Sequence, residues 1–238
     1  MPLAALDSGG ATVGLLYIVA FSLFIYGIKL GTHPTTARRG NGIAAFGMAV
    51  AVAATLAQKG IGNWGLIIGG IVLGSLIGAF ASKRVKMTEM PQMVALYNGL
   101  GGGAIALIAW SEYRHWVHQA SEIEALKSVA DASGGSSVFG TLSASIPLEV
   151  MIPTLLAMVI GSISFWGSNV AFAKLQELIP SHPMGLPGQK IINGVLLAVL
   201  VAGAVYLGIN NDYLDLSEPV FIGMLVLAAV LGTMVVMP

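Results

Sequence analysis

Two short polar clusters lie inside otherwise apolar stretches of this chain, and their residue types and spacing are the best candidates for chemistry. Asn98 lies in the run MPQMVALYNGLGGGAIALIAW, directly after Tyr97 and before the glycines at 99 and 101–103. The run GSISFWGSNVAFAKL carries the second cluster, whose members are Ser162, Ser164, Ser168 and Asn169. Amide and hydroxyl groups in an apolar environment need hydrogen-bond partners on another helix or in water. Together the clusters predict a polar path between two helices that water can enter.

The same residues also have a plainer interpretation. An asparagine between two helices can simply hold them together, and serines in membrane helices often bond their own backbone four residues back. Neither Asn nor Ser titrates, so a proton can pass them only through water or with a titratable group from elsewhere.

Ionisable residues are few and stay near the ends of the apolar blocks. An ionisable group deep in a membrane is costly and predicts a function, but none lies in the middle of a block. Those near block ends, where long side chains reach the interface, are Lys29, Glu149, Lys174 and Lys190. The histidines lie between blocks, at His33, His115, His118 and His182. Because no third ligand is evident beside His115 and His118, the sequence predicts no metal site.

The segment SKRVKMTEMPQ connects the third and fourth apolar blocks and is dense in charge. It carries Arg84, Lys86 and Glu89, and its Thr88 suits the start of a helix. Basic residues in such a segment are typical of a loop that stays on the cytoplasmic side. A second interpretation is a coupling loop, on which a cytoplasmic domain docks, joined directly to the helix that carries Asn98.

The elements that must position these residues are membrane-spanning helices. Charged residues make up only 9% of the 238 residues and hydrophobic ones 56%, whereas about a quarter of a soluble domain is charged. The apolar residues form blocks of about 20 residues, the length that crosses a bilayer as a helix. The sequence therefore predicts an all-α integral membrane protein with about seven transmembrane helices, at 11–30, 42–58, 64–82, 92–110, 149–173, 190–209 and 219–237. This composition excludes a soluble enzyme.

The connection 111–148 and the loop charges predict the topology. Residues 111–130 have helical spacing with charges between apolar residues, which favours an amphipathic helix at the interface, followed by a flexible break at 133–137. Basic residues follow the first, third and fifth spans, whereas Asp7, Asp212, Asp215 and most other acidic residues lie in the remaining loops. The positive-inside rule then places the N-terminus outside, the C-terminus in the cytoplasm and the 111–148 connection outside. Lys59, Arg114 and Lys127 are basic exceptions.

The composition excludes some classes of function but does not identify one. Zero net charge gives no attraction to nucleic acid, and the absence of cysteine excludes disulfides and thiolate chemistry. Two classes stay open on these grounds: a secondary transporter or ion channel, and a structural subunit of a membrane complex.

Four runs carry a resemblance to a known family. They resemble the membrane domain of the beta subunit of proton-translocating NAD(P) transhydrogenase, and they read HPTTARRGNGIAAFGMAVAVAATL, VKMTEMPQMVALYNGLGGGA, GSISFWGSNVAFAKLQELI and LPGQKIIN. The similarity covers nearly the whole chain except the 111–148 connection. The resemblance implies an enzyme complex that couples hydride transfer from NADH to NADP⁺ with proton flow across the membrane.

The resemblance also implies roles for residues already singled out. It places Asn98, a histidine in some members, and Ser168 in the proton pathway, and we expect Tyr97 and Asn169 to belong to it. We expect the loop with Arg84, Lys86 and Glu89 to couple the membrane helices to the nucleotide domain.

The rest of the complex is implied in the same way. The family continues into two more helices and an NADP-binding domain, so we expect this chain to be part of a longer protein. Alone it is expected to bind no cofactor or metal and to catalyse no hydride transfer, because other domains bind NAD(H) and NADP(H). Expected partners are alpha subunits, the NADP-binding domain and the lipid bilayer, in a dimeric complex of the inner (plasma) membrane.

Overall fold

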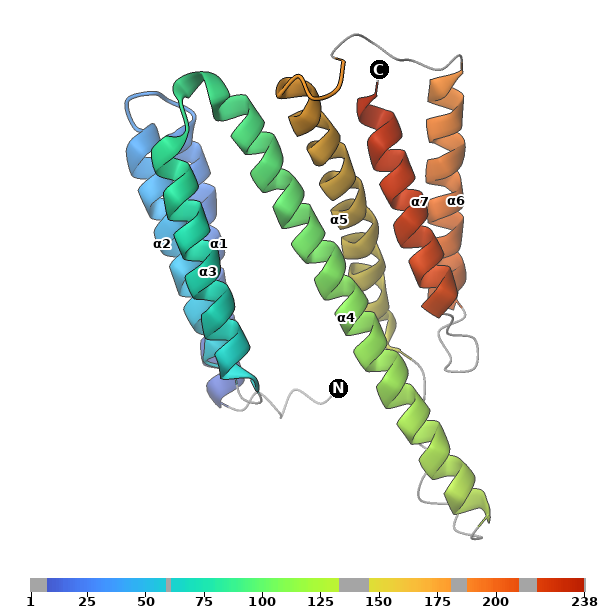
Figure 1. Cartoon of the computed structure of the whole chain (residues 1–238). Coiled ribbons are helices and arrows are strands. Elements are labelled where there is room, and N and C mark those ends of the chain that lie inside the picture. The colour runs from blue at the N-terminus through green and yellow to red at the C-terminus, as the bar shows by residue number, and fades with distance from the viewer. Residues whose placement is uncertain (1–7, 59–60, 133–145, 181–187, 210–217, 238) are drawn as a thin grey trace. The chain divides into compact units, whose positions relative to one another are not determined.

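The structure is a computed structural model that describes residues 8–58, 61–132, 146–180, 188–209 and 218–237. Over these ranges the secondary structure is helical, and seven helices are long and apolar enough to cross a membrane. They are α1 (Ser8–Gly31), α2 (Ala37–Leu56), α3 (Trp64–Arg84), α4 (Met90–Ala132), α5 (Leu148–Leu175), α6 (Gln189–Ile209) and α7 (Glu218–Val236) (Figure 1). The predicted multi-pass helical membrane protein is therefore confirmed.

The chain divides into two compact units, residues 1–83 and 84–238. In the first unit α1 and α2 pack antiparallel at very short range. A Cβ added to Gly40 would lie 2.6 Å from the carbonyl oxygen of Gly27. Tyr17 and Thr55 join the other ends of the pair by a hydrogen bond of 2.8 Å between their hydroxyls. Small residues permit this approach, as is usual between membrane helices.

The second unit arranges its helices in the order α4, α5, α7 and α6 (Figure 1). α4 and α5 are antiparallel, α7 runs parallel to α5, and α6 runs antiparallel to α7, as the cross-helix contacts below show. Its core is a cluster of fully buried side chains, the largest of which are Tyr113, Phe221, Ile146, Met151, Met158, Leu200 and Leu207. Every helix of this unit except α4 is close to a single bilayer crossing in length.

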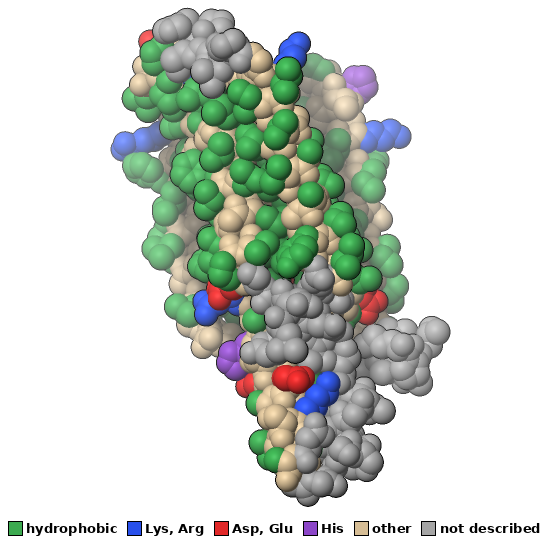
Figure 2. All heavy atoms as spheres, turned by 90° about the vertical axis from the view of Figure 1, so that its right-hand side faces the viewer, with side chains coloured by type: hydrophobic (Ala, Val, Ile, Leu, Met, Phe, Trp, Pro, Cys, Tyr) green, Lys and Arg blue, Asp and Glu red, His purple; other side chains and the backbone are tan. Residues whose placement is uncertain are grey.

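The outer face of the second unit is apolar, as a lipid-facing surface requires. Figure 2 shows hydrophobic side chains over the middle of the α6 and α7 face, with charged side chains towards its ends. Exposed apolar side chains here include Ile191, Val195, Ile209, Ile222 and Val226. In a bilayer these side chains lie against acyl chains of equal polarity, so their exposure costs little.

α4 differs most from the expected organisation. Residues 111–130 are helical, but they continue the fourth span without a break instead of forming a separate helix. The stretch from Ser111 to Ala132 contains neither proline nor glycine, so nothing interrupts the helix. At 1.5 Å per residue, 43 residues reach about 64 Å, roughly twice the ~30 Å hydrocarbon core. The last part of α4 extends past the ends of α5 and α7 (Figure 1).

Other differences are small. α2 begins at Ala37, ahead of the predicted start at 42, because the polar residues after Thr36 are already helical. The predicted break at 133–137 and the residues Asp7, Lys59, His182, Asp212 and Asp215 lie outside the described residues.

Candidate functional site

The two predicted polar clusters meet at the contact between α4 and α5. The side-chain amide nitrogen of Asn98 donates hydrogen bonds to the hydroxyl oxygens of Ser168, at 2.7 Å, and Ser164, at 3.2 Å. These serines lie one turn apart on the same face of α5. Asn98 is exposed within the second unit, whereas both serines are half-buried. The site therefore opens outward from the α4 and α5 pair, at a depth where the sequence predicts membrane.

Glycines bring the two backbones close enough for this contact. A Cβ added to Gly102 would lie 2.8 Å from the carbonyl oxygen of Gly161, and one added to Gly161 would lie 2.7 Å from that of Gly102. One turn away, Gly99 is buried, and an added Cβ would lie 3.2 Å from the Cβ of Ser168. The glycines after Asn98 therefore bring α4 close enough to α5 for the Asn98 side chain to contact Ser164 and Ser168.

The other predicted pathway residues take different positions. The side-chain nitrogen of Asn169 donates to the carbonyl oxygen of Phe165 at 2.8 Å, one turn back on its own helix. It also lies 3.3 Å from a Cβ added to Gly99, so it borders the same contact. Tyr97 is 46% exposed and precedes Asn98 on α4. The structure brings Asn98, Ser164 and Ser168 together, and the roles of Tyr97 and Asn169 stay predictions.

A second contact ties α5 to α7. The buried hydroxyl of Ser162 donates to the carbonyl oxygen of Leu225 at 2.9 Å, and a Cβ added to Gly232 would lie 2.5 Å from the carbonyl oxygen of Ile163. An apolar cavity of about 460 Å³ lies beside the Ser162 to Leu225 contact, bounded by α4, α5 and α7. Sequence reasoning placed Ser162 in the polar cluster but missed its partner, because a backbone carbonyl leaves no signal in the sequence.

The ends of α4, α5, α6 and α7 that lie near the coupling loop are joined by polar contacts. Lys174 donates from its ammonium group to the carbonyl oxygens of Val236, at 2.8 Å, and Met237, at 2.7 Å. Val236 is the last residue of α7 and Met237 follows it, and a cation beside the C-terminal end of a helix also complements the helix dipole. Lys174 is half-buried, and its ammonium group lies between the ends of α5 and α7. Gln92 likewise donates to the carbonyl oxygen of Leu175 at 2.9 Å, and Gln189 to that of Met234.

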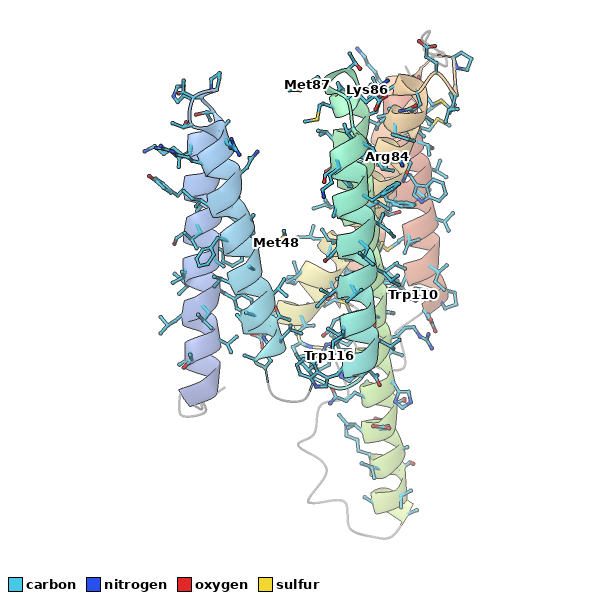
Figure 3. All side chains as sticks on the ribbon, turned by 60° about the vertical axis from the view of Figure 1, so that its left-hand side comes forward. Met48, Arg84, Lys86, Met87, Trp110 and Trp116 are labelled. Atoms are coloured by element: carbon cyan, nitrogen blue, oxygen red, sulfur yellow. The ribbon has the colours of Figure 1, made fainter. Side chains whose placement is uncertain are left out.

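The predicted coupling loop is a compact turn that leads into α4. A 3-10 turn, Met87–Glu89, precedes the helix. The backbone N–H of Lys86 donates to the Glu89 carboxylate at 3.3 Å, and the N–H of Glu89 donates to the Lys86 carbonyl oxygen at 2.9 Å. Glu89, and not Thr88 as expected, makes the side-chain contact that closes this turn. Figure 3 shows Lys86 and Met87 at the turn, with Trp110 and Trp116 farther along α4.

Comparison with known proteins shows a family whose members resemble this chain over most of its length. Residues 13–238 match the family described as NAD(P) transhydrogenase beta subunit. The NAD(P) transhydrogenase subunit beta of Rhodospirillum rubrum is 32% identical over 173 residues, which cover 73% of this chain and 33% of the relative. The subunit of the same name from a particular strain of that species is similar to the same extent. The chain thus spans about a third of the length of the curated relatives it matches. By sequence and by its membrane-length helices, it belongs to the NAD(P) transhydrogenase beta subunit family.

Proposed function

We propose that this chain is the proton-conducting membrane part of a transhydrogenase, an enzyme complex that couples hydride transfer between NAD(H) and NADP(H) to proton translocation. The observation that carries the proposal is the hydrogen-bonded contact of Asn98 with Ser164 and Ser168, between two membrane-length helices. Membership of the beta subunit family supports the overall reaction.

The chemistry of the contact suits water-mediated conduction. Hydroxyls both donate and accept hydrogen bonds, whereas the Asn98 nitrogen only donates, so the serines can orient a file of water molecules. Asn98 faces outward, where water or a further helix can reach it. Because asparagine and serine do not titrate, we propose that another helix or subunit supplies the group that takes up the proton during turnover.

Coupling requires that the proton path bias the nucleotide domain. A proton-motive force of ~200 mV corresponds to about 4.6 kcal/mol per charge, which must favour one of two conformations that differ in nucleotide affinity. We propose that α4 is the element with two positions, since it carries Asn98 and begins at the turn that Lys86 and Glu89 close. A shift of α4 against α5 would move this turn directly.

The arrangement of the complex follows from the same proposal. The coupling loop with Arg84, Lys86 and Glu89 faces the NADP-binding domain in the cytoplasm, and the far end of α4 lies outside the inner membrane. The alternation of helix directions in the second unit puts Lys86, Lys174 and Lys190 at one end, in accord with this orientation. Alpha subunits and a second beta subunit complete the dimeric assembly.

The test uses the complete complex in sealed vesicles. Proton uptake is followed during NADPH-driven reduction of an NAD⁺ analogue, with wild type, Ser168→Ala and Ser22→Ala compared. Ser22 is the matched control, because its hydroxyl donates to the carbonyl oxygen of Ile18 on its own helix, at 2.8 Å. We expect Ser168→Ala to lose proton uptake and turnover together while Ser22→Ala keeps both. Wild-type vesicles that move no protons would contradict the proposed function, and full activity of Ser168→Ala would indicate a structural subunit.

A further inference from the structure

The turn that joins α1 to α2 gathers exposed cations, with no acidic residue near them in the sequence. Lys29 lies in the last turn of α1, Arg38 and Arg39 lie in the first turn of α2, and all three are exposed. Residues 8–88 contain neither aspartate nor glutamate. Over the described part of the chain, the ion pairs are formed by other side chains. We call these three cations and the residues between them the basic turn.

Backbone and hydroxyl contacts hold the basic turn in one shape. The carbonyl oxygen of His33 accepts a hydrogen bond from the backbone N–H of Thr36 at 3.1 Å. The Thr36 hydroxyl donates to the carbonyl oxygen of Leu30 at 2.6 Å. The two helices meet here as well, because a Cβ added to Gly40 would lie 2.8 Å from the backbone nitrogen of Gly31. Basic residues directly precede Leu30 and Gly40 in the chain, so the cations of both helices are held beside this contact.

The basic turn lies at the depth of lipid phosphates. The apolar block within α2 begins at residue 42, and Arg38 lies outside it in the same helix. At 1.5 Å per residue, Arg38 is then about 6 Å beyond the edge of the hydrocarbon core. The headgroup layer is roughly 5–8 Å thick on each side of that core. Lys29 ends the apolar block of α1, and its long side chain can extend into the same layer.

The stability of α2 does not account for its two arginines. The N-terminal end of a helix carries a partial positive charge, so cations in the first turn are unfavourable and acidic residues are preferred there. The first turn of α2 has no acidic residue. Three exposed cations at headgroup depth, with no carboxylate on either helix, are suited to an anion that comes from outside the pair.

We propose that the basic turn binds the phosphate groups of anionic phospholipids. A guanidinium group donates paired hydrogen bonds to phosphate oxygens and keeps its charge throughout the physiological pH range. A zwitterionic lipid also carries a phosphate, but its ammonium group would meet no carboxylate on α1 or α2. An anionic lipid has no such unmatched cation. The inference goes beyond the proposed function and does not depend on proton conduction.

The experiment measures lipid binding by native mass spectrometry of the complete complex in detergent. The complex is titrated with phosphatidylglycerol or with phosphatidylcholine of the same acyl chains. Wild type should bind phosphatidylglycerol more tightly. The double variant Arg38→Gln with Arg39→Gln should bind it roughly 25-fold more weakly, because each cation near an anionic lipid surface is worth about fivefold in affinity. Glutamine is as good a helix former as arginine, so α2 should be retained.

Two further double variants show whether charge at this turn is the cause. Arg38→Lys with Arg39→Lys keeps both charges and should stay close to wild type. The matched control is Arg114→Gln with Lys127→Gln, which removes two cations elsewhere on the chain. Arg114 pairs with Glu218 at 3.4 Å and Lys127 with Glu124 at 3.9 Å, so both control cations already face a carboxylate. The control should bind phosphatidylglycerol as wild type does.

Two results would overturn the inference. If wild type binds the two lipids equally, or if the glutamine double variant binds phosphatidylglycerol as tightly as wild type, the cations serve only to orient the helices in the membrane. If the glutamine double variant loses a subunit while its lipid binding is unchanged, the basic turn contacts an acidic protein surface instead of lipid. Neither result bears on the proposed function, which is tested separately by proton uptake in vesicles.

Discussion

Adding a single methyl group at Gly102 should separate α4 from α5 and weaken the Asn98 contact. A Cβ there would lie 2.8 Å from both the Gly161 carbonyl oxygen and the Ser164 Cβ, and 2.9 Å from the Phe165 nitrogen. Two of these atoms are backbone, so no side chain can rotate away. Restoring ordinary van der Waals separation moves the helices apart by at least about half an ångström. The Asn98 to Ser164 bond, already 3.2 Å long, would then be lost.

Substitution of the neighbouring Gly101 separates the cost of the steric clash at Gly102 from the change in helix propensity. Overpacking of this kind costs about 1–3 kcal/mol, while alanine gains about 1 kcal/mol of helix propensity over glycine. A Cβ on Gly101 meets nothing within 4 Å, so Gly101→Ala gains the propensity alone. The two variants should therefore differ in stability by the overpacking cost of ~1–3 kcal/mol, with Gly102→Ala lower.

The assay is thermal unfolding of the detergent-solubilised complex together with proton-coupled turnover in vesicles. Gly102→Ala should unfold at a lower temperature and turn over more slowly than Gly101→Ala. Equal stability and equal turnover of the two variants would refute the close α4 and α5 approach on which the site depends.

Three further predictions concern the contacts around the site. Lys174→Met removes the donor to the Val236 carbonyl oxygen and should lower the free energy of unfolding of the complex by about 1.5 kcal/mol, measured by thermal unfolding. Lys190→Met, at an exposed lysine, is the control and should leave the stability unchanged. Equal effects of the two variants would contradict the role of Lys174. Ser162→Ala removes one bond between helices and should cost about 0.6 kcal/mol of stability with near-normal turnover; loss of proton uptake would instead place Ser162 in the path. Glu89→Gln keeps an acceptor for the Lys86 N–H but removes the charge, and it should lower the ratio of protons moved to hydride transferred; an unchanged ratio would argue against coupling through this turn.

Much of the fold follows from the sequence because the membrane constrains it so strongly. A block of about 20 apolar residues has few alternatives to a helix in a bilayer. The full length of α4 was harder to predict from the sequence, because hydropathy indicates where a helix leaves the hydrocarbon core and not where the helix ends. The absence of glycine and proline between Ser111 and Ala132 was the available signal.

The candidate site was only partly predictable. Residue type identified Asn98, Ser164 and Ser168 as polar groups in apolar segments, and the glycines after Asn98 indicated a close helix contact. Which groups meet depends on the rotation of α4 against α5, which one sequence does not specify. The same limit hid the contact of Ser162 with α7 and that of Lys174 with the end of the same helix.

The most direct test of the central claim is to measure proton uptake and hydride transfer together in sealed vesicles that contain the complete complex with Asn98→Ala. If Asn98 orders the proton path through α4 and α5, assembled variant complex should lose proton uptake and coupled turnover in parallel, while wild type retains both. Wild-type rates of both processes in Asn98→Ala would contradict the account.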